Sequence, residues 1–81
     1  MAAHNTEIAE LFDRLATLLE IEGANPFRVR AYHNAARIIE GHAQQMSSLL
    51  AEGADLSELP GIGEDLAEKI ATIVETGSLP A

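Results

Sequence analysis

The only lysine of the 81-residue chain is Lys69, and a lysine amine is one of the few side chains that can act as a nucleophile. Such a lysine must be partly neutral near pH 7, a state that desolvation or neighbouring cations favour. Here the residue one helical turn earlier is Asp65, and Glu68 is adjacent in sequence. An acid four residues before a lysine favours a helix-surface ion pair of about 0.2–0.5 kcal/mol. The sequence therefore favours an ion pair at Lys69 and leaves nucleophilic chemistry as the alternative.

A second candidate site is the segment Leu59-Pro60-Gly61-Ile62-Gly63, which precedes a helical pattern. Glycine can adopt positive φ and leaves the backbone unobstructed. The N–H groups at the start of the following helix would then point outward, and such a helix end is a ready anion site. Because phosphate contacts read no bases, DNA binding here would be sequence-independent. The predicted phosphate-binding amides are those of Gly61, Ile62, Gly63, Glu64 and Asp65.

Three of the arginines, Arg28, Arg30 and Arg37, lie close together and leave room for one local phosphate-binding face. The planar guanidinium group suits phosphate. Arg28 and Arg30 are two residues apart and do not share a helix face, so we expect at least one of them to contact phosphate. Tyr32 falls on the apolar face of the same helix, where a core position with the hydroxyl at its edge is favoured over base stacking.

These residues are positioned by a helical pattern that contains no strand signals. Apolar residues recur at steps of three and four. Four stretches show this pattern: 6–22, 26–40, 44–52 and 64–76. Asn5 is the expected cap of the first helix, and Asn25 followed by proline opens the second. Asp55 and Glu58 have the form of a capping box over a single turn, which Pro60 must end. We expect an all-α fold, a small bundle of four to five short helices.

Composition limits the classes of protein to consider. With 47% hydrophobic and 22% charged residues the chain should fold, as a single domain over 1–81. The absence of cysteine excludes disulfides and thiolate metal sites, and His4, His33 and His42 are too irregularly spaced for zinc. No apolar run approaches the roughly 18 residues of a membrane helix, and we expect a cytoplasmic location. The net charge of −8 argues by composition against a polyanion partner, so any DNA-binding face must be local.

Two blocks of the sequence resemble a known family. Leu59-Pro60-Gly61-Ile62-Gly63 followed by Ala67 resembles the helix-hairpin-helix DNA-binding motif. The block Asn25-Pro26-Phe27-Arg28-Val29-Arg30-Ala31-Tyr32, with the terminal Thr76-Gly77, resembles the N-terminal domain of bacterial and archaeal family X DNA polymerases. The resemblance covers nearly the whole chain. It implies a small helical domain, similar to the lyase domain of DNA polymerase beta, that grips the downstream side of a DNA gap during repair.

The resemblance also implies roles for individual residues. A 5′-phosphate would be held near the hairpin, with Arg28 and Tyr32 in the same pocket. Lys69 matches the lysine that can form a Schiff base with the deoxyribose C1′. The chain departs from lyase-active relatives at Asp65, where they carry another lysine. We therefore expect the isolated domain to be at most a weak deoxyribose-phosphate lyase.

By the same resemblance, the main-chain carbonyls of Ser57, Leu59 and Ile62 would bind a monovalent cation, Na⁺ or K⁺, that bridges to a DNA phosphate. Mg²⁺ is expected only in a polymerase domain outside this chain, which ends at Leu79-Pro80-Ala81 and is interpreted as a fragment of a larger polymerase. The expected partners are gapped or nicked DNA with a 5′-phosphate and the remaining domains of the parent, with no membrane. The alternatives are a protein-docking module without DNA binding and an active lyase.

Overall fold

The computed structural model describes residues 4–77, and every regular element in that range is helical. The elements are α1 (Asn5–Ile21), α2 (Pro26–Gly41), α3 (Met46–Ala51), the 3₁₀ turn η1 (Leu56–Glu58) and α4 (Glu64–Thr76). The predicted all-α class is confirmed. Within these residues no helix is long and apolar enough to span a membrane.

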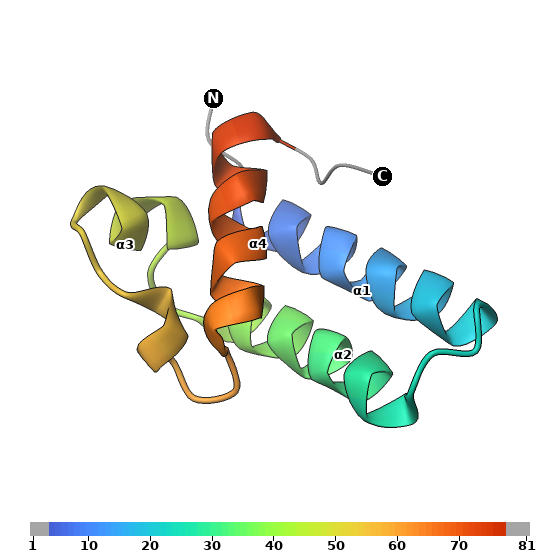
Figure 1. The fold of residues 1–81 in the computed structure, drawn as a ribbon. Helices are drawn as coiled ribbons and strands as arrows, with labels where there is room; N and C mark the ends of the chain where they lie inside the picture. Colours follow the sequence, from blue (N-terminus) through green and yellow to red (C-terminus); the bar gives the residue numbers. More distant parts are fainter. Residues whose placement is uncertain (1–3, 78–81) are drawn as a thin grey trace.

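The helices are arranged as a crossed assembly (Figure 1). α1 and α2 run antiparallel, and α4 crosses the pair near the N-terminal half of α1 and the C-terminal half of α2. α3 and η1 lie on the far side of α4 (Figure 1). The turn between α1 and α2 therefore projects beyond α4, and the large apolar side chains that are most exposed are found at this end: Leu18, Ile21 and Phe27.

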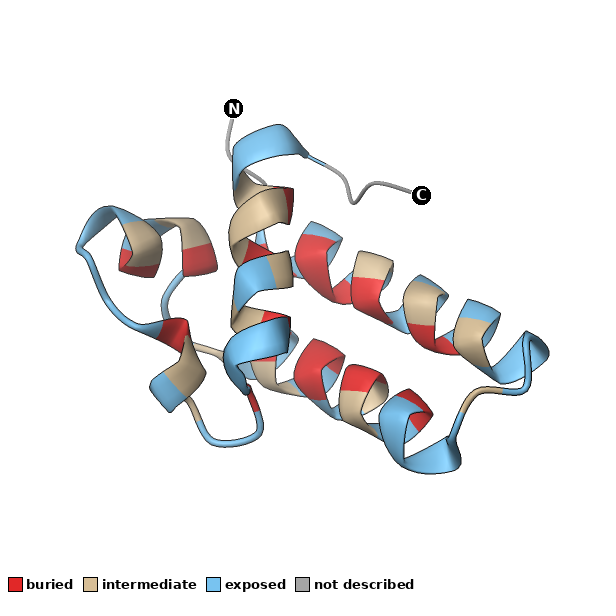
Figure 2. Cartoon of the chain, in the orientation of Figure 1, coloured by how far each residue is buried: buried red, intermediate tan, exposed pale blue. Residues whose placement is uncertain are grey.

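The core is formed by one apolar stripe from each helix (Figure 2). Its largest fully buried side chains are Phe12, Ile8, Ile39, Met46, Ile70 and Ile73. Leu18, which lies in the three-and-four pattern of residues 6–22, is 55% exposed. The spacing is correct, but α4 does not reach this part of α1 (Figure 1).

Asn5 does not cap α1, so this prediction is wrong. The residue is buried, and its Oδ1 accepts a hydrogen bond from Met46 N at 2.8 Å while its Nδ2 donates to Gln44 O at 2.8 Å. His4 takes the capping position, and Glu7 Oε1 accepts the His4 N–H at 3.1 Å. Asn5 thus ties the start of α1 to the start of α3, which begins two residues later than predicted.

The cap of α2 forms as expected, and Asp55 caps η1, but through Ser57 and not in the predicted capping box with Glu58. Asn25 Oδ1 accepts a hydrogen bond from Phe27 N at 2.8 Å, with Pro26 in the first helical position. Asp55 Oδ1 accepts hydrogen bonds from Ser57 Oγ at 2.6 Å and Ser57 N at 3.0 Å. These two bonds, the side-chain one first, lower the pKa of Asp55 below its ordinary value. Both caps are local, which is why the sequence predicted them.

Candidate nucleic-acid interface

The hairpin between η1 and α4 is a tight turn that lies against α2. Ile62 N donates to Leu59 O at 2.9 Å, Pro60 occupies the second position and Gly61 has φ +85°. Positive φ at the third position is the requirement of a type II turn, so the prediction for Gly61 is confirmed. A Cβ on Gly61 would stand 2.5 Å from Ile38 Cδ1. The turn therefore favours glycine through its positive φ, while a larger residue would also require the end of the Ile38 side chain to shift.

Gly63 behaves differently from Gly61 and does not use the positive φ that glycine allows. Its backbone is extended, with φ −90° and ψ −179°, a conformation open to any residue. A Cβ placed on Gly63 would meet no atom within 4 Å. Neither conformation nor packing among the described residues explains a glycine here. Gly63 is, however, the N-cap of α4. It has no side chain that could accept hydrogen bonds from the first N–H groups of the helix.

The five amides predicted to bind phosphate are not equivalent. The Ile62 N–H is donated within the turn to Leu59 O, which corrects its assignment as a phosphate donor. Glu64 and Asp65 begin α4 and are exposed, and the first N–H groups of an α-helix have no partner within the helix. The open donors of the hairpin therefore lie at the start of α4, beside Gly63.

Tyr32 lies between Lys69 of α4 and Arg28 of α2. Its side chain is buried, as predicted, and its ring meets Phe12 edge-on at 5.7 Å between centroids. The Arg28 guanidinium carbon lies 5.8 Å from the Tyr32 ring centroid. From α4, Lys69 approaches closely enough for the Tyr32 hydroxyl to affect its pKa. The structure therefore brings Arg28, Tyr32 and Lys69 onto one surface.

Lys69 is held in the predicted ion pair. Its Nζ donates to Asp65 Oδ1 at 2.9 Å, and the lysine side chain is 28% exposed. The hydrogen bond to Asp65 is the main cause that raises the pKa of Lys69, with a smaller contribution from Tyr32, while partial burial acts in the opposite direction. This environment stabilises the ammonium form.

Arg30 points away from that surface, as the two-residue spacing from Arg28 implies. Its guanidinium carbon lies 4.9 Å from the ring centroid of Phe27, which is 74% exposed. Arg30 is among the residues that the sequence predicts to contact phosphate, whereas Phe27 is not. The available signal was that Phe27 lies off the buried stripe through Val29 and Tyr32, because two residues correspond to about 200° around a helix.

The opposite flank of α4 is acidic. Asp55, Glu64 and Glu68 line a hollow of about 290 Å³, together with Ser57 and the apolar residues Leu50, Ala54, Leu56 and Ala67. Glu68, which the sequence placed near the Lys69 ammonium, thus faces α3 and η1 instead. No lysine or arginine of the part of the chain described here lines this hollow.

The carbonyls predicted to hold a monovalent cation lie in and before the turn. Leu59 O accepts one hydrogen bond, from Ile62 N, and a carbonyl oxygen has two lone pairs. Oxygen ligands suit a hard cation such as Na⁺ or K⁺. The main-chain carbonyl oxygens of Ser57, Leu59 and Ile62 are therefore of the right ligand type. Over residues 4–77 no three His, Asp or Glu side chains are grouped as a metal site would require.

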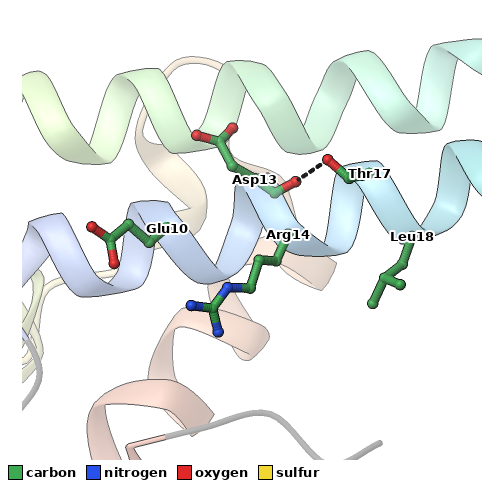
Figure 3. Close-up of a pocket in the computed structure, with 5 residues that line it drawn as sticks. All are labelled: Glu10, Asp13, Arg14, Thr17 and Leu18. Carbon is green, nitrogen blue, oxygen red and sulfur yellow. Dashed lines mark hydrogen bonds between the residues drawn. The ribbon is translucent and has the colours of Figure 1, made fainter.

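A wider hollow of about 490 Å³ lies on α1 and contains none of the residues predicted for DNA binding. Its lining includes Glu10, Asp13, Arg14, Thr17 and Leu18 (Figure 3). Asp13 projects toward α2, where its Oδ1 lies 2.9 Å from His33 Nδ1, whereas Arg14 and Leu18 project away from α2 (Figure 3). Arg14 is thus remote from the arginines of α2.

Comparison with known proteins agrees with the hairpin geometry. The helix-hairpin-helix domain family matches residues 3–79. Over 74 residues, 91% of the chain, the sequence is 32% identical to a DNA polymerase/3′-5′ exonuclease PolX of Bacillus subtilis (strain 168). The match covers 12% of that relative, so the chain spans only a small part of its length.

Proposed function

Because the chain belongs to the helix-hairpin-helix domain family, we propose that it binds DNA without sequence preference through the start of α4. The observation that carries the proposal is Gly63, an N-cap without a side chain, whose glycine is required by neither conformation nor packing. A phosphate can approach the backbone at such a position, where the free N–H groups and the helix dipole favour an anion.

We further propose that the bound phosphate is the 5′-phosphate at a gap or nick. Arg28, which lies at the Tyr32 ring, is the cation whose forked geometry suits a phosphate, and Lys69 adds a second positive charge. Arg30 and the exposed ring of Phe27 offer a stacking surface for a base, since an aromatic ring accepts any base on its face. A monovalent cation at the carbonyls of Ser57, Leu59 and Ile62 would offset further phosphate charge.

Lyase chemistry is a weaker part of this proposal. A Schiff base forms when a neutral amine attacks the C1′ aldehyde carbon and water leaves, so the ammonium must first lose its proton. The Asp65 carboxylate opposes that loss at Lys69. We propose that Lys69 acts mainly as a phosphate-facing charge, and that nucleotide transfer and its Mg²⁺ belong to other domains of a larger polymerase.

A single substitution tests the proposed site. Gly63→Asp introduces a preferred N-cap, which should maintain or raise stability, and places a carboxylate where the phosphate would lie. We expect the affinity for 5′-phosphorylated gapped DNA, measured by fluorescence anisotropy, to fall at least about tenfold, the effect of roughly 1.4 kcal/mol. The matched control is His4→Asp, which adds the same charge at the N-cap of α1. Equal losses in both variants would contradict the proposal.

One observation favours the alternative of a protein-docking module. The hollow on α1 is bordered by Leu18, which is 55% exposed, and Ile21 at the end of the same helix is 76% exposed. Amide resonances distinguish the two functions. DNA binding should shift Gly61 and Gly63, whereas a titration with gapped DNA that shifts no resonance, or only those of α1, would favour docking.

A further inference from the structure

The exposed apolar side chains of the molecule gather at one end. Residues 18–30, which we call the turn end, form the part of the α1–α2 hairpin that projects beyond α4 (Figure 1). Leu18, Ile21 and Phe27 are the large apolar side chains that are exposed in the described chain, and all three belong to the turn end. Leu18 and Ile21 are three residues apart on α1 and are therefore neighbours on the helix surface. Exposed apolar residues that cluster in this way indicate a contact surface.

The charged side chains of the turn end are placed against the dipoles of their own helices. Glu20 and Glu22 lie at the C-terminal end of α1, whose last turn carries no basic residue. Arg28 lies in the first turn of α2, which carries no acidic residue, and Arg30 follows it. A helix C-terminus favours cations, and a helix N-terminus favours anions. Both pairs of side chains therefore lie where the backbone of their own helix disfavours their charge.

Within the described chain these four side chains have no oppositely charged partner. All four are exposed, and neither ion pair among residues 4–77 includes any of them. Arg28 and Arg30 lie instead near the rings of Tyr32 and Phe27. The turn end thus combines an unpaired acidic side on α1, an unpaired basic side on α2 and exposed apolar residues.

We infer that the turn end is a site of self-association, at which two copies of the chain meet about a two-fold axis. A two-fold contact uses the same patch on both copies, so that patch must complement itself. The acidic end of α1 in one copy would face the basic start of α2 in the other, and the symmetry repeats this contact. The contact would also remove the apolar side chains of both copies from water.

A second copy complements the turn end better than a partner of one charge sign. A basic protein would be repelled by the arginines, and a polyanion would be repelled by Glu20 and Glu22. Net charge opposes association between two chains of −8, so the local order of charges must provide the attraction. The inference does not depend on the DNA binding proposed above. Since Arg28 belongs to both surfaces, DNA and the second copy would compete for it.

The test measures self-association of the 81-residue chain by sedimentation equilibrium at about 0.1 M salt. Glu20→Arg with Glu22→Arg reverses the acidic side, and Arg28→Glu with Arg30→Glu reverses the basic side. Each reversed variant is examined alone, and the two are also examined as an equimolar mixture. Both reversals agree with the helix dipoles, so each variant should keep its stability or gain some in thermal unfolding.

The matched control is Glu52→Arg with Glu75→Arg. It makes the same change of charge at the C-terminal ends of α3 and α4, where no large apolar side chain is exposed. Circular dichroism establishes that all variants are folded.

We expect the unmodified chain to dimerise with a dissociation constant of about 10⁻⁴ M, because few apolar side chains take part. Each reversed variant alone should associate at least about tenfold more weakly, and the mixture should recover the original affinity within about threefold. Net charge alone predicts the opposite for the glutamate variant, whose net charge is less negative than that of the unmodified chain. The control should change the affinity by less than about twofold.

Three results would overturn the inference. The first is an unmodified chain that stays monomeric up to about 1 mM. The second is a mixture that associates no more strongly than its two components, because acid–arginine contacts between copies would then be absent. The third is a monomeric chain in which gapped DNA shifts the amide resonances of Leu18 and Ile21, since the turn end would then serve DNA and not a second copy.

Discussion

The ammonium group of Lys69 shows how one neighbouring residue sets the chemistry of another. Because the hydrogen bond from Lys69 to Asp65 raises the pKa of the lysine, the neutral amine is scarce at pH 7.5 and becomes more abundant as pH rises toward that pKa. Borohydride trapping on a 5′-deoxyribose-phosphate substrate should therefore give little adduct at pH 7.5 and more at pH 9.5. Asp65→Asn, which removes the main cause of the shift, should increase the yield at both pH values.

Lys69→Ala is the control for this prediction. Any adduct that persists in this variant comes from the N-terminal amine, whose lower pKa leaves it partly neutral. Efficient trapping by the unmodified chain at pH 7.5 that disappears in Lys69→Ala would contradict the prediction. In that case Lys69 would be the nucleophile.

The two hairpin glycines give a prediction about stability. Gly61→Ala forces a side chain into positive φ and against Ile38, and should lower the free energy of unfolding by about 1–2 kcal/mol or more. Gly63→Ala keeps an ordinary backbone conformation and changes only the N-cap, so its loss should stay below about 1 kcal/mol. Urea denaturation measures both values. Similar losses for the two variants would show that Gly63 also has a structural role.

At the scale of the elements, Asn5 joins two helices that lie far apart in sequence. Asn5→Ala would leave the buried Met46 N–H without its acceptor, and should lower the free energy of unfolding by about 1–3 kcal/mol. Asn25→Ala is the comparison, because it removes an exposed local cap and should cost about 1 kcal/mol. Urea denaturation should rank Asn5→Ala as the more damaging change; the reverse order would mean that water satisfies the start of α3.

The single turn η1 depends on the charge state of its cap. The pKa of Asp55 is lowered in the folded chain, so its contribution to stability is present above the ordinary value of 3.8 and is lost as pH falls through the lowered pKa. Asn at this position can still accept the Ser57 N–H but has no charge to lose. In thermal unfolding between pH 5 and pH 2, Asp55→Asn should therefore lose less stability than the unmodified chain. Identical acid profiles would show that the Asp55 cap does not contribute.

The elements differ in how far sequence alone could predict them. The sequence predicts the bounds of α2 and α4 accurately because their signals are local. Asn25 and the following proline mark the start of α2, and Gly77 marks the end of α4. The role of Asn5 could not be predicted, since its partner Met46 is 41 residues away. In the site, the i,i+4 spacing predicted the Asp65–Lys69 pair. The direction of Glu68 could not be predicted, because it depends on where α3 and η1 pack against α4.

At the scale of the whole molecule, a net charge of −8 must be reconciled with a polyanionic ligand. The structure brings Arg28 and Lys69 together at Tyr32, while Asp55, Glu64 and Glu68 lie on the other flank of α4. The attractive face is therefore small. Binding by the isolated domain should be weak, in the nonspecific range of about 10⁻⁴–10⁻⁶ M at physiological salt.

The salt dependence of the binding constant reports how many cationic side chains contact phosphate. If Arg28 and Lys69 each neutralise one phosphate, the slope of log K against log salt should be about −2, since each contact contributes about −0.9. Arg28→Ala should make the slope less negative by about 1 and weaken binding equally for different base sequences. Arg14→Ala is the matched control, because Arg14 projects from α1 away from α2 (Figure 3). Anisotropy titrations from 20 to 200 mM NaCl measure both slopes. An equal change in the two variants would show that the net charge of the molecule, and not the face formed by α2 and α4, governs the interaction with DNA.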